Sequence, residues 1–286
     1  MSKHSEGTFR NLAIGCVTAA LMILCAWNTA GARLIMKVQP CAADLQSCPD
    51  RGCAEPRSVE ALANQLKRRW PASTEPIILG FDDLERLQGA ADALVGQGVL
   101  LNEQARQKLR SLRSSSGPGR EGDFVQMVGY VVSAPYYVKK GESVNCDLTG
   151  PENNDLRIAI ARGPRDTDFD GISVVMIPYW RPRGWNVESL LRVAKEQHLV
   201  LVRGQLFYDS EHQVNDDPDV ESPGQPRRFS LWEIHPVTDF YVCMPEGTSC
   251  DARHLKEWER LELALSRPHV DTEKFTPEEV QEETIR

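Results

Sequence analysis

The chain lacks the sequence motifs of several common catalytic sites. It contains no GxxxxGK[ST] phosphate loop, no GxSxG nucleophile turn and no HExxH histidine pair, which argues against P-loop, serine-hydrolase and zinc-protease chemistry. No internal repeat is visible. Basic residues are also in deficit, with 33 Lys and Arg against 41 Asp and Glu and a formal net charge of −8. A nucleic-acid partner is therefore not expected, because binding to a phosphate backbone depends on clustered Lys and Arg.

What the chain does contain is ordinary globular material. Its 286 residues are 41% hydrophobic and 26% charged, enough for one substantial core or two modest ones. The densest apolar stretches, residues 199–209 and 229–243, are rich in β-branched and aromatic residues. Val200, Val202, Leu206 and Tyr208 alternate at period two, which predicts two half-buried neighbouring strands.

The N-terminus has the pattern of an export signal. Lys3 and Arg10 precede an uncharged run from Leu12 to Trp27, and Ala30 and Ala32 form the small-residue pattern of a signal-peptidase site. We expect residues 1–32 to be removed as a signal peptide and the chain to be exported to the periplasm or another extracytoplasmic location. The alternative is an uncleaved anchor, in which residues 12–32 hold the chain in the cytoplasmic membrane.

Six cysteines remain after the export signal, and their number is even. An even count in an oxidising compartment predicts disulfides, with fifteen possible connectivities, and the spacings fit no common zinc site. We favour a bridge from Cys146 to Cys243, with the local pair Cys243 and Cys250 as the alternative. The six candidates are Cys41, Cys48, Cys53, Cys146, Cys243 and Cys250.

Helical patterns come before strand patterns along the chain. Ser58 is placed to cap a helix that ends before Pro71, further helices are expected around Leu84 to Leu94 and from Asn102 to Arg113, and one more from His254 to Ser266. We divide the chain into residues 1–32 (signal peptide), 33–113 (cysteine-containing segment and helical unit), 114–122 (linker), 123–250 (barrel), and 251–286 (helix and acidic disordered tail).

Between the linker and Cys250 the pattern is strand, strand, strand, helix, strand, strand. The first strand is long and bent at Gly129, and Asn186 caps the single helix. This order predicts an OB-fold, a five-stranded Greek-key barrel. The predicted fold class is therefore α+β, with a small N-terminal helical unit, an OB-like barrel with one helix between its third and fourth strands, and a C-terminal helix.

Five motifs between Cys48 and Cys243 resemble a bacterial family of exported, OB-like proteins with a WEIHPV-type last strand. They are NQLKRR (64–69), EGDFVQMVGYV (121–131), GESVNC (141–146), FYDSEH (207–212) and LWEIHPVT (231–238). The resemblance implies an exported OB-like barrel but no particular activity, substrate or cofactor. Histidines are frequent in that family at the positions of Asp147 and Arg157, so a site built from them is not expected in this chain.

One set of polar residues on the last two strands is a candidate site. Asp209, His212, Glu233 and His235 offer carboxylates and imidazoles, and Glu233 and His235 share one face of a strand. The alternative is a structural network in which these groups satisfy one another, and this interpretation is favoured because no catalytic template matches their spacing.

Two further groups are candidates for ligand contact. Arg162, Arg165, Arg181 and Arg183 form a possible basic ligand face. Aromatic residues that could stack on a ligand are Tyr130, Tyr136, Tyr137, Tyr179, Trp180 and Trp185. We expect an exported, non-catalytic binding or interaction module of unknown ligand or protein partner, without cofactor or metal. The alternative is a metal-assisted OB-barrel hydrolase of nuclease type.

Overall fold

The computed structural model describes residues 40–112, 117–243 and 250–264. The predicted signal peptide or anchor, part of the predicted linker and the predicted tail from residue 265 lie outside the described residues. Contacts group the described residues into one compact unit that contains both the N-terminal helices and the barrel. Among the described residues, no helix is long and apolar enough to cross a membrane.

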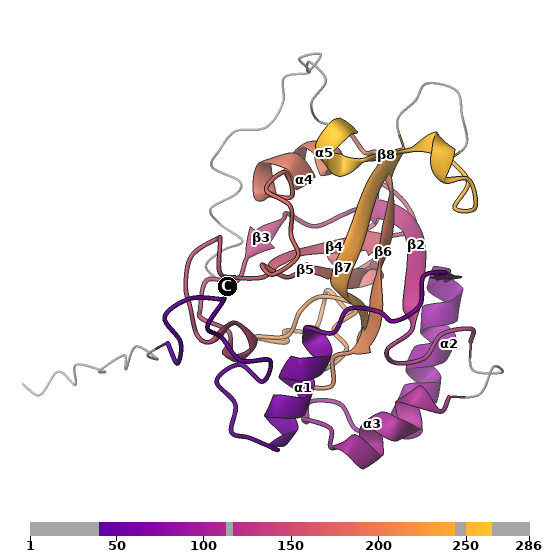
Figure 1. Cartoon of the computed structure of the whole chain (residues 1–286). Helices are drawn as coiled ribbons and strands as arrows, with labels where there is room; N and C mark the ends of the chain where they lie inside the picture. Colours follow the sequence, from indigo (N-terminus) through magenta and orange to yellow (C-terminus); the bar gives the residue numbers. More distant parts are fainter. Residues whose placement is uncertain (1–39, 113–116, 244–249, 265–286) are drawn as a thin grey trace, which may run out of the picture. The chain divides into compact units, whose positions relative to one another are not determined.

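Three helices precede the barrel, and local sequence explains where each begins. α1 (Val59–Lys67) starts after Ser58, whose side chain accepts a hydrogen bond from the backbone N–H of Ala61. α3 (Glu103–Arg110) starts after Asn102 in the same way. α2 (Phe81–Asp92) begins at Gly80 and buries one apolar stripe. In Figure 1 these helices lie below the barrel.

Five strands close into a barrel with the connectivity of an OB-fold. β2 pairs antiparallel with both β4 and β6, β4 with β5, and β6 with β7, while β5 and β7 pair in parallel and close the ring. In chain order the barrel strands are β2 (Phe124–Val131), β4 (Leu156–Ala161), β5 (Ile172–Met176), β6 (Leu199–Tyr208) and β7 (Trp232–Cys243). α4 (Val187–Lys195) connects the third and fourth of them, so the predicted OB-like α+β fold is confirmed.

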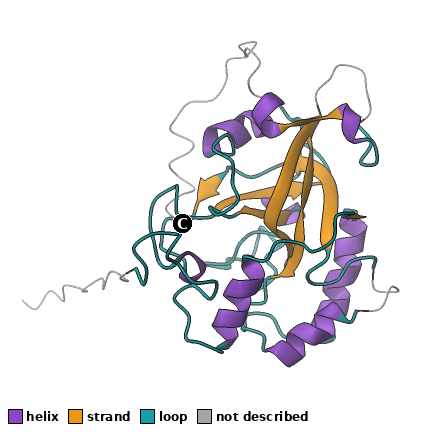
Figure 2. Cartoon of the chain, viewed as in Figure 1, coloured by secondary structure: helices purple, strands orange, loops and turns teal. Residues whose placement is uncertain are grey.

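Three short strands extend the sheet beyond the barrel. β1 (Ile77–Ile78) pairs in parallel with β2, and β3 (Tyr136–Tyr137) pairs with β4. β8 (Trp258–Arg260) adds to β7 near its end. Figure 2 shows strands at the centre and helices at the periphery.

The helix expected from His254 to Ser266 is wrong over the described residues. That stretch forms a 3-10 turn (Leu255–Glu257), strand β8 and a single helical turn, α5 (Leu261–Ala264). The apolar spacing fits a helix, but the unpaired edge of β7 offers backbone hydrogen bonds, and the Trp258 Nε1–H also donates to the Asp251 carbonyl. Tertiary pairing overrides the local pattern here.

Side chains of the barrel strands alternate between an apolar interior and a polar outer face. Trp232 and Ile234 of β7 belong to the core, whereas Glu233 and His235 point to the opposite face. That outer face is nevertheless buried, with His235 at 0% exposure. A charged outer face that is buried requires a covering element, and α1 supplies it.

Candidate functional site

The structure brings the four predicted polar residues together around an arginine. Oδ2 of Asp209 and Nδ1 of His212 form a hydrogen bond of 2.7 Å, and Oε1 of Glu233 and Nδ1 of His235 form one of 2.8 Å. Arg228 connects these two pairs, because it donates from Nη2 to Asp209 at 2.7 Å and from Nη1 to Glu233 at 3.0 Å. We call these five residues the polar cluster.

Arg228 was missed by the sequence analysis. It is 0% exposed, and its backbone pairs with that of Asn215 across the loop between β6 and β7. The signal that could have found it is electrostatic: two carboxylates on neighbouring buried strands require a cation, because an unpaired buried charge is very costly. Arg228 lies five residues before Glu233, close enough along the chain to fill that role.

A second group of polar residues continues the cluster toward the start of β4. Nε2 of His235 faces Oδ2 of Asp155 at 3.9 Å, too far for a hydrogen bond, and neither atom has a hydrogen-bond partner among the described residues. Oδ1 of Asp155 accepts from Asn145 at 3.0 Å, and Arg157 donates to Glu142 at 2.9 Å. The outer face of the barrel therefore carries a continuous band of charged groups.

The charges within the polar cluster hold its carboxylates in the ionised form. Burial alone would raise the pKa of Asp209, but the charge of Arg228 and the hydrogen bond with His212 keep that pKa well below its usual range. Burial and the nearby Asp209 would likewise raise the pKa of Glu233, but its hydrogen bond with His235 lowers that pKa below the ordinary value. Both carboxylates are therefore ionised partners of Arg228.

Helix α1 covers this band. Lys67 donates to Glu211 at 2.6 Å, and Gln205 on β6 donates to the carbonyl of Leu66 at 2.8 Å. Asn64 donates to the side chain of Ser143 at 3.0 Å, in the 3-10 turn before β4. Through these contacts α1 covers the polar band and shields it from solvent.

The covered band is poorly placed for chemistry on an external substrate. Asp209, Glu233 and His235 are 2%, 1% and 0% exposed, and within the polar cluster only the His212 side chain, at 30%, reaches solvent appreciably. Within the described residues, the one set of three close metal-ligating groups is Cys41, Cys53 and Cys146. These sulfurs are bound in disulfides and so are not free thiolate ligands.

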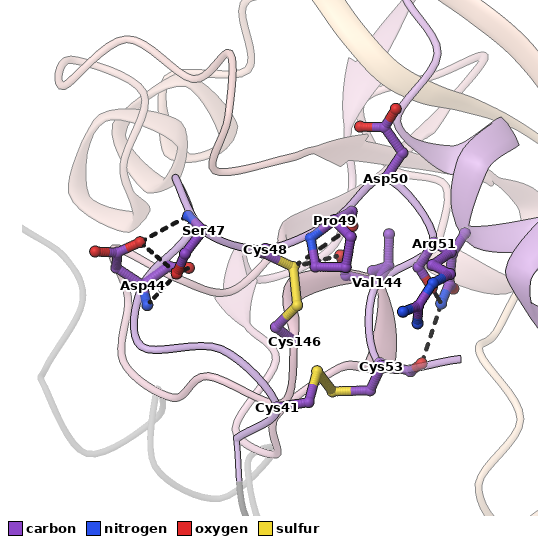
Figure 3. The surroundings of a disulfide bond; sticks show 12 residues. Cys41, Asp44, Ser47, Cys48, Pro49, Asp50, Arg51, Cys53, Val144 and Cys146 are labelled. Carbon is purple, nitrogen blue, oxygen red and sulfur yellow. Dashed lines mark hydrogen bonds between the residues drawn. A yellow bond between two sulfur atoms is a disulfide. The ribbon is translucent and has the colours of Figure 1, made fainter. Parts of the chain in front are cut away.

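All six predicted cysteines form disulfides, as Figure 3 shows for two of the three bridges. The pairs are Cys41–Cys53, Cys48–Cys146 and Cys243–Cys250, with Cα separations of 5.6, 5.8 and 5.9 Å. Disulfides persist in oxidising surroundings, so these bridges indicate an extracytoplasmic compartment.

The favoured bridge between Cys146 and Cys243 is wrong, and the local alternative for Cys243 is correct. Cys146 lies before β4, where residues 41–53 pack against the turn Ser143–Asn145 through the hydrogen bonds from Cys41 N–H to the Cys146 carbonyl and from Cys53 N–H to the Ser143 carbonyl. Cys243 ends β7 beside β8. The prediction failed because no pattern in residues 33–56 indicated which strand end they would cover.

The four predicted arginines are not gathered in one face. Arg162 follows β4 and pairs with Asp82 and Glu85 of α2. Arg181 lies near the start of β4 and donates to three carbonyl oxygens, including that of Asn154. Because β4 separates these two sites, they lie roughly 20 Å apart along the strand direction. Arg165 and Arg183 are both exposed.

A different surface gathers aromatic and basic side chains from three segments. Trp70 and Trp180 are 52% and 47% exposed and meet edge to face, with ring centroids 5.4 Å apart and an interplanar angle of 76°. Arg181 lies over the ring of Tyr137 at 5.1 Å. These contacts join residues 67–71, 136–140 and 179–183, which we call the aromatic–basic surface.

Interactions beneath this surface fix its shape. The guanidinium of Arg68 stacks on Tyr179 at 3.8 Å and donates to the carbonyl of Pro49 at 2.6 Å. The Cys48–Cys146 bridge anchors the same region. Tyr136, Tyr137, Tyr179 and Trp180 are among the predicted ligand contacts. The helix predicted to end before Pro71 ends at Lys67, so Trp70 lies outside it. Trp185, another candidate, is 3% exposed and belongs to the core.

Comparisons with known proteins add little to this description. No family model matches the chain, and no curated protein matches it. A solved structure, the small single-stranded DNA-binding protein from Streptomyces coelicolor, matches at 16% identity over 44% of this chain and 96% of that one, with a TM-score of 0.23. A score this low carries no argument, so the fold assignment rests on the strand connectivity described above.

Proposed function

We propose that this chain is an exported, non-catalytic binding module that contacts its ligand through the aromatic–basic surface. The observation that carries this proposal is the pair Trp70 and Trp180, two large aromatic side chains in contact and about half exposed. Exposed aromatic groups rimmed by polar residues mark interaction sites. Residues 136–140 lie in the loop between the first and second barrel strands, one of two loops with which OB-folds bind ligands.

The burial of the polar cluster supports a binding role over the hydrolase alternative. A metal-assisted hydrolase needs carboxylates that face both a metal and a substrate. Asp209 and Glu233 instead face Arg228 beneath the cover formed by α1. The strand order is also consistent with membership in the exported OB-like family that the sequence motifs resemble, which we retain as a proposal.

Export and cleavage form part of the same proposal. The three disulfides support an extracytoplasmic location, and the N-terminal pattern supports cleavage after Ala32. Mass spectrometry of protein from the periplasm of the native host should give a mature chain that begins near Arg33. Full-length chain in the membrane fraction would instead favour the anchor, and full-length chain in the cytosol would overturn export.

The ligand surface can be tested by titration with soluble probes. We propose isothermal titration with a chitin-type oligosaccharide and with an oligothymidylate, each against the wild type and a Trp70→Ala, Trp180→Ala double variant. Stacking interactions of this kind are worth about 1–3 kcal/mol each, so the double variant should bind a true ligand at least ~10-fold more weakly. Val220→Ala, at another exposed apolar site (55%), is the control.

Two outcomes of this titration decide the surface assignment. A probe that binds the wild type and the double variant equally would show that the aromatic–basic surface is not its binding site. The net charge of −8 disfavours nucleic acid, so we expect the oligonucleotide to be the weaker probe.

A further inference from the structure

We infer that the aromatic–basic surface docks on an anionic membrane surface, with Trp70 and Trp180 at the level of the lipid headgroups. This inference rests on the proposed function, because it names the partner of the same surface. Two features carry it: the charge of the three segments and the geometry of the two tryptophans.

The charge of the surface is opposite to that of the whole chain. Residues 67–71, 136–140 and 179–183 hold seven Lys and Arg, five aromatic residues and no Asp or Glu, whereas the chain has a net charge of −8. Carboxylates from outside the segments pair with two of the seven cations, Glu211 with Lys67 and Asp50 with Arg68. The exposed cations among them are Arg69, Lys139, Lys140 and Arg183. Juxtamembrane clusters of four or more cations are attracted to anionic lipids, and the effect is local because it decays within a Debye length.

The angle between the two tryptophan rings suits a membrane interface better than it suits stacking on a flat ligand. Trp70 and Trp180 meet at 76°, so one flat ligand cannot stack on both rings at the same time. Tyr136, in the second of the three segments, is 44% exposed as well. Trp and Tyr are enriched at membrane interfaces, where an apolar ring and a polar N–H or O–H are both accommodated, and Arg and Lys extend toward the headgroups around them.

Fluorescence quenching by brominated lipids tests the inference on the full chain. The background variant is Trp27→Phe, which removes the tryptophan of the N-terminal apolar run. Three of the remaining tryptophans, Trp185, Trp232 and Trp258, are 3%, 0% and 7% exposed and are shielded from lipid. Quenching in this background therefore reports Trp70 and Trp180. The vesicles contain phosphatidylglycerol and phosphatidylcholine, brominated at upper acyl positions, with a pure phosphatidylcholine comparison.

We expect quenching on the anionic vesicles and its loss when Trp70→Phe and Trp180→Phe are added. Replacing the four exposed cations by Gln should weaken the affinity for anionic vesicles, measured from the quenching, ~10-fold or more, since each cation contributes to the attraction by anionic lipid. Arg165→Gln with Arg253→Gln, two exposed cations outside the three segments, is the matched control. Quenching that is absent in the Trp27→Phe background, or unchanged by the cation replacements, would overturn the inference.

The outcome also separates this inference from the proposed function. If the vesicles give no quenching but a soluble probe binds in a manner that depends on Trp70 and Trp180, the surface is a ligand site and membrane docking is refuted. If neither vesicles nor soluble probes respond to those substitutions, both proposals fail.

Discussion

Replacing Arg228 by methionine removes the only cation that connects the two halves of the polar cluster among the described residues. The substitution keeps an unbranched apolar side chain but removes the guanidinium, and it leaves Asp209 and Glu233, at 2% and 1% exposure, without their shared cation. Breaking a buried ion pair by removing one partner typically costs about 3–5 kcal/mol, because an uncompensated charge remains buried. We therefore expect the free energy of unfolding at pH 7 to fall by about that amount, which corresponds to a decrease in Tm of about 10 °C.

The pH dependence of this loss follows from the pKa values of the two carboxylates. In the wild type the lowered pKa of Asp209 and of Glu233 contributes stability that is fully present above about pH 4, the unfolded value, and is lost as the pH falls through the folded pKa. In the variant, burial without Arg228 raises both pKa values, so protonation relieves the unpaired charges. The difference between the proteins should therefore shrink as the pH falls from 7 to about 4.

Urea unfolding with intact disulfides measures both effects. The matched control is Arg227→Met, at the adjacent residue, whose side chain is 39% exposed and lies 3.6 Å from Asp168; an exposed pair of this kind is worth about 0–1 kcal/mol. If Arg228→Met cost less than about 1 kcal/mol, or if its cost did not change with pH, the polar cluster would not be the buried ion-pair network that we describe.

Four other variants test the architecture. Loss of the bridge by Cys48→Ser with Cys146→Ser should cost up to about 4–5 kcal/mol, because it opens a loop of 98 residues. Cys250→Ser opens a loop of only 7 and should cost about 2 kcal/mol, so equal costs would contradict the entropic argument. Burial raises the pKa of Tyr208 to about 12, so this residue should be the last tyrosine to ionise as the pH is raised. In a titration followed by tyrosinate absorbance, Tyr208→Phe should therefore lose only the final ionisation step. Glu233→Gln should lower stability by about 1–3 kcal/mol without a specific loss of ligand binding, and the reverse pattern would identify Glu233 as a functional residue.

Local patterns were sufficient to predict the barrel strands. The alternation of Val200, Val202 and Leu206 is a property of the strand itself, and all three residues face the core. The capping roles of Ser58 and Asn186 are likewise local, since each side chain accepts from an N–H three residues later. Such signals can be read from the sequence because they depend only on residues that are close together along the chain.

Features that depend on distant contacts were not predictable in the same way. Trp258 carries a helical spacing, but an available strand edge determines its conformation. Trp70 continues the apolar stripe of α1, but the helix ends before it and the side chain meets Trp180 instead. Cys146 has five possible partners, and its choice of Cys48 depends on where residues 41–53 pack. In each case the deciding partner is far away in sequence.

The contacts that hold α1 in place have a consequence for the order of folding. Lys67 is paired with a residue 144 positions later, Leu66 accepts from a side chain 139 positions later, and Cys48 is bridged to a residue 98 positions later. The first described helix therefore has no stable place to pack until β6 has been synthesised, and contacts of such large sequence separation form slowly. A chain arranged in this way stays unfolded at its N-terminal end while it is still being made, which is the condition in which a polypeptide can be threaded through a narrow secretion channel.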